Sequence, residues 1–311
     1  MAQRLSEPGI NAATSDVFVH GWLAQTWQLV LWNLFHLRRR GMSRWLSSLF
    51  FGGYALLLLL TIISHMLLAH SSTPRVGADP IVALAFPGSL QFALGYLGLL
   101  APIFLCIVAG TLVGGDYTYG MHNQMLTRGL GRGQVFTAQV AALALVALLA
   151  VGFVMLISTL LGFLIGPLFG LRPVLLAPFG WLGFVLTWLT QSLRYFIYML
   201  IAVLAATIGR SAIAGIGFSV GYVFIEFLAT NILFSLVGGL SAPIGRAIVA
   251  FVSNLPGTVS NSLNTYATTL IAGQPMPDLD QLPLQLFLTL MYSVILIALS
   301  YLIYQHSDIF D

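Results

Sequence analysis

The run "TAQVAALALVALLAVGFVMLISTLLGFLIG", Thr137 to Gly166, decides what kind of chain this is. It contains no Asp, Glu, Lys or Arg over its whole length. A helix needs about 20 apolar residues to cross the hydrocarbon core of a bilayer. A segment this long and this apolar therefore predicts a transmembrane helix.

Five further apolar runs lie on either side of it, at 46–69, 90–113, 181–207, 212–238 and 284–304. Arg194 and Glu226 are the only Asp, Glu, Lys or Arg residues in them. The chain is 59% hydrophobic and 7% charged, whereas a soluble domain carries about 25% charged residues. We therefore predict an all-α integral membrane protein, with a single six-span transmembrane domain over residues 45–311.

The stretch before the first span, "VFVHGWLAQTWQLVLWNLFHLRRRG" at 17–41, has two faces at about 100° per residue. Apolar side chains fall on one face and amides, His36 and arginines on the other. This pattern predicts an amphipathic helix in the membrane interface, within an N-terminal region 1–44. Four arginines would meet lipid phosphates there: Arg38, Arg39, Arg40 and Arg44. A seventh span is the alternative, but the polar face is too wide for hydrocarbon.

Arginine placement predicts the orientation, since segments on the cytoplasmic side of a membrane carry the excess of positive charge. With the N-terminus inside, eight arginines are cytoplasmic and three are external. We expect a multi-pass protein of the cell membrane, inner or plasma, with both termini cytoplasmic. The external segment 239–283 predicts two short helices broken at Pro256–Gly257. They would lie at the outer surface or dip back into the bundle.

Motifs of catalysis are missing from the sequence. The chain has no lysine, so it has no G-x-x-x-x-G-K-[ST] phosphate-binding loop. The "GFSVG" run around Ser219 has no histidine in a later span to act as its base. The single cysteine and the histidines do not cluster as metal ligands. We expect no catalytic, metal or cofactor site in this chain, and a net charge of +3 gives no reason to expect nucleic acid.

Arg194 and Glu226 each lie 16 residues from the turn near Arg210, which corresponds to about 24 Å along a helix. Equal depth on neighbouring spans predicts an ion pair, because unpaired charges at that depth are costly. The pair would lock the helices together or line a transport path, and outward snorkelling is the third interpretation. Glycines at i, i+4 (Gly217 and Gly221; Gly162, Gly166 and Gly170) predict close helix packing, within one subunit or between two.

One polar stretch, "GGDYTYGMHNQMLTRGLGRGQ" at 114–134, separates the second and third spans. We expect Gly114–Gly115 to end the second span and Asp116 to cap a short helix. Glycines would break this helix before the third span. Its contact residues would be Tyr117, Tyr119, Met121, Met125 and Leu126, and Arg128 and Arg132 would meet acidic groups or headgroups. The alternative is a plain solvated loop.

The order of these elements resembles the permease subunits of ABC-2 type exporters. Those often carry, after the second span, an acid, Gly-Thr and then Leu-Thr-x-Pro-x-Ser-Arg. Here the matching positions are Asp116, Gly120, Leu126, Thr127 and Arg132, whereas Met121, Gly129 and Gly131 replace the family's residues. The ending "YQHSDIF" is similar to the family's basic-Asp-Ile ending.

The resemblance implies that segment 114–136 couples the spans to a separate ABC ATPase subunit, which would bind ATP and Mg and drive substrate efflux. The coupling residues would be Asp116, Tyr117, Tyr119, Gly120, Met125, Leu126, Arg128 and Arg132. It also implies a second permease copy, with the substrate path between the two. Two other interpretations remain: a non-transporting membrane subunit, or an autonomous secondary transporter, which should show repeats and several intramembrane ionisable groups.

Overall fold

The computed structural model describes residues 14–69, 80–118, 131–172, 175–176, 178–233, 242–274 and 279–306. Within these ranges every regular element is helical. The long helices are α1 (Thr14–Arg39), α2 (Gly41–Ala69), α3 (Gly88–Thr118), α5 (Arg132–Leu168), α6 (Pro178–Gly209), α7 (Ala212–Leu228), α9 (Ala242–Ser253), α10 (Pro256–Ala272) and α11 (Leu282–His306). Short turns of helix are η1 (Pro80–Leu84), η2 (Ala229–Leu233) and η3 (Leu279–Gln281).

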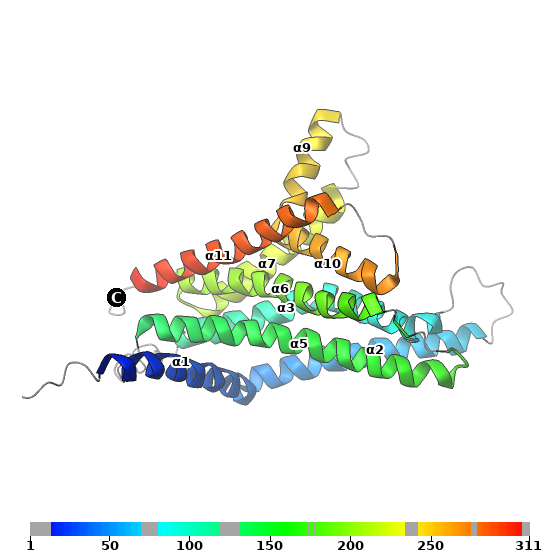
Figure 1. Ribbon diagram of the computed structural model, residues 1–311, viewed down its shortest axis with the longest axis horizontal. Coiled ribbons are helices and arrows are strands. Elements are labelled where there is room, and N and C mark those ends of the chain that lie inside the picture. The colour runs from blue at the N-terminus through cyan, green and yellow to red at the C-terminus, as the bar shows by residue number, and fades with distance from the viewer. Residues whose placement is uncertain are drawn as a thin grey trace, which may run out of the picture.

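Six of these helices are long and apolar enough to cross a membrane: α2, α3, α5, α6, α7 continued by η2, and α11. They coincide with the six predicted runs, and the chain is a multi-pass membrane protein. The start of α1 and the end of α11 lie at the same end of the molecule (Figure 1). We call this the arginine-rich end, because Arg132 bonds the last turn of α11, Arg40 of the α1–α2 corner (Arg38–Arg44) bonds the last turn of α3, and Arg210 follows the end of α6.

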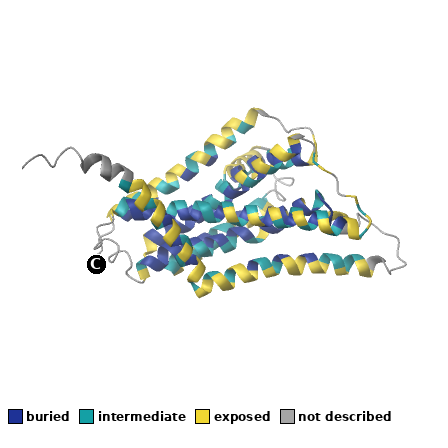
Figure 2. Ribbon diagram, turned by 60° about the horizontal axis from the view of Figure 1, so that its bottom comes forward, coloured by how far each residue is buried: buried dark blue, intermediate teal, exposed yellow. Residues whose placement is uncertain are grey.

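Helix α6 forms the centre of the bundle, and α2, α7 and α11 form its outer surface. Two thirds of the apolar window of α6 is buried, against about a tenth for α2 and a sixth for α7 and α11. Figure 2 shows buried residues gathered along the middle helices and exposed ones on the outer helices. Exposed leucines on the outer helices are expected, since lipid tails are as apolar as leucine.

Aromatic side chains pack between α2 and α3. Over residues 41–67, the part of α2 whose side chains the structure describes, the buried residues are Phe50, Tyr54 and Leu58, one stripe at helical spacing. The ring of Phe50 lies 5.3 Å from that of Tyr96 and 5.2 Å from that of Phe104. The hydroxyl of Tyr96 also donates to the carbonyl of Phe50.

The glycines spaced four residues apart on α5 lie against neighbouring residues, whereas those on α7 do not. A Cβ on Gly162 would meet Ser89 and the backbone of Phe86, and one on Gly166 would lie 3.4 Å from Ala85. These glycines therefore let α5 approach its own neighbours. A Cβ on Gly217 or Gly221 of α7 would meet no neighbouring atom within 4 Å, so packing among the described residues does not explain their spacing.

Helix α1 packs along the start of α5. Val30 of α1 is buried against Ala138 and Ala142. The predicted apolar face is divided: Val30 and Leu37 are buried, whereas Leu23, with 64% exposure, belongs to an outward side. The helix itself is confirmed over Thr14–Arg39.

The predicted end of the second span is wrong. Helix α3 continues through Gly114 and Gly115 to Thr118, and Asp116 lies inside its last turn. The physical reason is close approach: a Cβ on Gly114 would overlap the backbone of Ala212, and one on Gly115 would lie 2.8 Å from Arg40 Nη1. The two glycines permit helix packing here and do not end the helix.

The two predicted external helices are present as α9 and α10, with Pro256 starting the second. Helix α10 returns into the bundle along α6, whereas α9 projects away from it (Figure 1). A Cβ on Gly183 of α6 would lie 2.7 Å from Leu270 of α10, so the two backbones nearly touch. Of the two predicted positions for α10, the structure has the one inside the bundle.

Candidate functional site

An ion pair joins the α1–α2 corner to the end of α3. Arg40 Nη2 lies 3.2 Å from Asp116 Oδ1, and its Nη1 donates to the carbonyl of Thr111. Gln139 Nε2 of α5 donates to Asp116 Oδ2 at 2.8 Å. The Asp116 side chain is 2% exposed and that of Arg40 is 18% exposed. The Asp116 carboxylate of α3 thus bonds both the α1–α2 corner and α5.

This cluster corrects two predictions. Asp116 is not the cap of a separate short helix, and Arg40 turns inward to Asp116 instead of standing free beside Arg38, Arg39 and Arg44, which are exposed. A buried carboxylate needs such partners, because leaving one half of a buried pair alone costs several kcal/mol. Sequence reasoning missed Gln139, since an amide two turns into an apolar helix gives no signal of its own.

Arg132 and Gln134 fix the start of α5 to its surroundings. Arg132 Nη1 donates to the carbonyl of Gln305 at 2.8 Å, at the end of α11. A cation is favourable there because the last carbonyls of a helix lack partners. Gln134 Nε2 reaches Gln25 Oε1 of α1 at 3.4 Å. The start of α5 therefore contacts both α11 and α1.

Tyr117 is the remaining predicted coupling residue that the structure describes. Its ring lies 6.4 Å from that of Tyr304, which lies 5.5 Å from that of Phe136. Five other predicted coupling residues lie outside the described residues: Tyr119, Gly120, Met125, Leu126 and Arg128. The structure thus brings together Asp116, Tyr117 and Arg132 at the two helix ends that flank residues 119–130.

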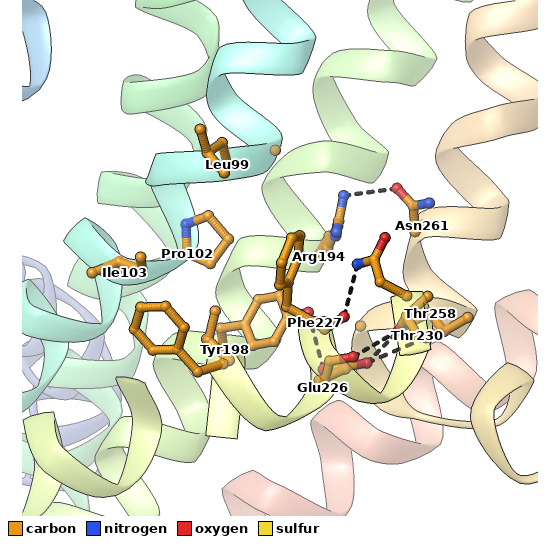
Figure 3. A pocket seen from close by; sticks show the side chains of 15 residues that line it. Leu99, Pro102, Ile103, Arg194, Tyr198, Glu226, Phe227, Thr230, Thr258 and Asn261 are labelled. Atoms are coloured by element: carbon orange, nitrogen blue, oxygen red, sulfur yellow. Dashed lines mark hydrogen bonds between the residues drawn. The ribbon is translucent and has the colours of Figure 1, made fainter. Parts of the chain in front are cut away.

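A second polar cluster lies where α10 runs antiparallel to α6, with Glu226 buried and the side chain of Asn261 exposed. Thr190 Oγ1 donates to Asn264 Oδ1 at 3.4 Å, and Arg194 Nη1 donates to Asn261 Oδ1 at 2.7 Å. One turn further on, Tyr198 approaches the start of α10 through Glu226. Polar residues at every fourth position of α6 thus face polar residues of α10, and Figure 3 shows the bond between Arg194 and Asn261.

Glu226 caps the start of α10 from another helix. Its Oε1 accepts from the backbone N–H of Thr258 at 3.0 Å and from the Thr258 hydroxyl at 3.4 Å. Its Oε2 accepts from the Tyr198 hydroxyl at 3.0 Å. Unsatisfied N–H groups and the helix dipole favour a negative charge at this place. A Cβ on Gly257 would lie 2.7 Å from Glu226 Oε1, so this close approach requires glycine.

The predicted ion pair between Arg194 and Glu226 is wrong. In the described part of the chain, each has other partners: Arg194 bonds Asn261, and Glu226 bonds Tyr198 and Thr258. The reason is α10, whose N-terminus lies against the carboxylate and whose asparagine reaches the guanidinium. Both side chains nevertheless line one cavity of about 190 Å³.

This cavity, which we call the Glu226 cavity, combines polar and apolar walls (Figure 3). Its apolar wall comes from α3 and α7, through Leu99, Pro102, Ile103 and Phe227, among others. Sequence reasoning missed Tyr198, Thr258 and Asn261. The signal for Thr258 was its position, because the third residue of a helix that begins Pro-Gly offers a free N–H.

Helix α3 joins the two clusters. It carries Asp116 in its last turn and lines the Glu226 cavity through Leu99, Pro102 and Ile103. Pro102 lies inside the helix, and a proline there removes one backbone hydrogen bond and favours a bend. One continuous helix therefore connects the Asp116 cluster with the cavity.

The fold and these two buried clusters define a multi-pass helical membrane protein with polar groups held inside its bundle. Residues 58–310 match a family described as a protein of unknown function (DUF2705), and the chain belongs to this family. This match covers all six spans from the middle of α2 onward. No curated protein matches the chain.

Proposed function

We propose that this chain is the permease subunit of an ABC-2 type exporter, coupling ATP hydrolysis by a separate ATPase subunit to efflux of a substrate. The observation that carries the proposal is the link through α3 between the helix ends flanking residues 119–130 and the Glu226 cavity. In this proposal the arginine-rich end is cytoplasmic, and α1 lies in the membrane interface with Arg38, Arg39 and Arg44 toward lipid headgroups.

Contacts at the arginine-rich end support transmission of force. Asp116 connects α3 with Arg40 and Gln139, and Arg132 connects α5 with the end of α11. A partner that pushed on residues 119–130 would act on α3 and α5 together, and through them on the α1–α2 corner and α11. Coupling of this kind needs an element with two arrangements that both sites bias. Pro102, where α3 lacks one backbone hydrogen bond, is the candidate for that element.

The Glu226 cavity supports a path for substrate. Polar and ionisable groups inside a membrane protein mark pathways for solutes, because they are costly to bury without a use. In the same proposal, the exposed face of α7 around Gly217 and Gly221 is where a second permease copy would pack.

The test is purification of the chain from its own host in mild detergent, with identification of what accompanies it. We expect an ATPase subunit that carries the G-x-x-x-x-G-K-[ST] phosphate-binding loop. Its rate of ATP hydrolysis in vesicles should rise when this chain is present. Asp116→Asn and Arg132→Ala should lower that stimulation. Arg172→Ala, an exposed arginine at the opposite end of the bundle, is the matched control and should not.

Purification without an ATPase, or among unrelated membrane subunits, would contradict the proposal. If the ATPase is present, Glu226→Gln separates transport from assembly. We expect it to impair efflux while the complex stays intact, since the change preserves the shape of the side chain. Normal efflux by that variant would leave Glu226 with a structural role alone.

A further inference from the structure

Two cavities at the arginine-rich end meet at Ser43, the third residue of α2. The first has a volume of about 540 Å³ and is lined by His36, Arg40, Ser43, Thr111 and Ala212, among others. The second has a volume of about 160 Å³ and lies between α2, α3 and α5. Ser43 lines both, so the two volumes are neighbours.

The first cavity offers hydrogen-bond donors and positive charge. Arginine has five N–H donors, of which the bonds to Thr111 and Asp116 use two. Ala212 is the first residue of α7, so the positive end of that helix forms part of the wall. Both Asp116 oxygens are already bonded, one to Arg40 and one to Gln139. This arrangement favours an anion over a cation.

His36 adds a donor to the same cavity. Its ring stacks on Trp32, with 5.0 Å between the ring centroids. Burial, and then the neighbouring Arg40 guanidinium, lower the pKa of His36. A neutral imidazole still has one N–H to donate.

The second cavity is almost wholly apolar. Phe50 and Phe51 of α2, Leu97 and Phe104 of α3, and Ala150 of α5 contribute to its wall. An apolar cavity of roughly 150 Å³ stays dry and accepts an apolar guest. Ser43 stands two residues into α2 and Phe50 about two turns further along the span. The polar cavity thus lies toward the membrane surface and the apolar one toward its middle.

We propose that the two cavities form one binding site for an anionic phospholipid, with its phosphate beside Arg40 and His36 and one acyl chain between α2, α3 and α5. The polar cavity lies nearer the membrane surface, as the headgroup of a phospholipid does, and the apolar cavity lies deeper, as its acyl chains do. Arg38, Arg39 and Arg44, all exposed around the α1–α2 corner, add to the attraction for an anionic headgroup. The site does not depend on whether the chain transports a substrate.

The test uses the full chain in phosphatidylcholine vesicles that contain phosphatidylglycerol with a diazirine in its acyl chain. After illumination, mass spectrometry locates the labelled residues. We expect label concentrated on the side chains that line the apolar cavity: Leu97, Ala101, Phe104, Leu105 and Val108 of α3 and Val146, Ala150 and Val151 of α5. Unlabelled phosphatidylglycerol should compete, whereas phosphatidylcholine and inorganic phosphate should not.

Variants separate the two parts of the site. Ala150→Phe fills the apolar cavity, and its control Leu149→Phe changes a neighbouring exposed side chain. Ser43→Glu places a negative charge where the cavities meet, and Ser43→Gln keeps the size without the charge. We expect Ser43→Glu to lower labelling roughly fivefold, the scale set by one surface charge near an anionic lipid. Ala150→Phe should also lower labelling of the cavity walls, because its ring occupies the space of the acyl chain. Resistance of Cys106 to a thiol reagent shows that each variant is folded, since this side chain is buried.

Two results would overturn the proposal. Label spread evenly over exposed lipid-facing residues of α5, such as Leu149 and Leu160, would show ordinary contact with the bilayer and no site. Label on the cavity walls that phosphatidylcholine displaces as well as phosphatidylglycerol would show an apolar groove without selection for an anion.

Discussion

Replacing Glu226 with glutamine tests whether a charged side chain caps α10 inside the bundle. Glu226 accepts from the Thr258 N–H at 3.0 Å and from the Tyr198 hydroxyl at 3.0 Å. Glutamine keeps the shape but loses the charge and exchanges one acceptor oxygen for a donor group. A hydrogen bond to a charged group contributes about 1 kcal/mol more than a neutral one. Two such bonds and the interaction with the helix dipole therefore predict a loss of roughly 2–3 kcal/mol.

Cys106 provides the assay, because it is the only cysteine in the sequence and is fully buried. Its Sγ lies 3.5 Å from the carbonyl of Tyr198, beside the Glu226 cluster. A thiol-reactive dye therefore labels the chain only as this part of the bundle opens during heating. For a large chain the expected loss lowers the labelling midpoint by about 5 °C.

The control is Asp280→Asn, which removes an exposed carboxylate in η3, just before α11. It should change the free energy of unfolding by less than about 0.5 kcal/mol. A midpoint for Glu226→Gln equal to or above that of the parent chain would refute the reasoning. In that case the carboxylate is not a stabilising cap, and the packing of α10 on α6 must come from other contacts.

Three further changes test other parts of the structure. Asp116→Asn and Arg40→Gln should each cost about 2 kcal/mol, less than a fully buried pair because Arg40 is partly exposed, and the double variant should lose less than their sum in the same dye assay. Gly114→Val should cost at least about 2 kcal/mol by overlap with α7, while Gly95→Val on the same helix, with nothing within 4 Å of its Cβ position, should change little; equal effects would contradict the close α3–α7 contact. Gly217→Ile should leave the labelling midpoint unchanged and weaken the proposed permease dimer, and a native mass spectrum with an unaltered dimer would exclude this face of α7 as the seam.

Sequence predicted the spans well because an uncharged apolar run is a local property. The run at 137–166 is longer than a bilayer requires, and α5 covers it from Arg132 to Leu168. The break before α10 was predictable for the same reason, since a proline lacks the N–H that would continue a preceding helix and is favoured at the first position of the next one, where Pro256 stands. The apparent end of the second span misled because glycine also permits close packing, and the backbone of Ala212 lies beside Gly114.

The sequence by itself determined six membrane-crossing helices and two further helices between the last two spans. Only the tertiary structure decided which polar groups meet. Asp116 pairs with Arg40 across 76 positions of sequence, and Glu226 caps a helix that begins 30 residues further on. Such pairings depend on how each helix is rotated and which neighbour it packs against. Apolar lipid-facing surfaces carry little information about rotation, so these contacts appear only once the helices are assembled.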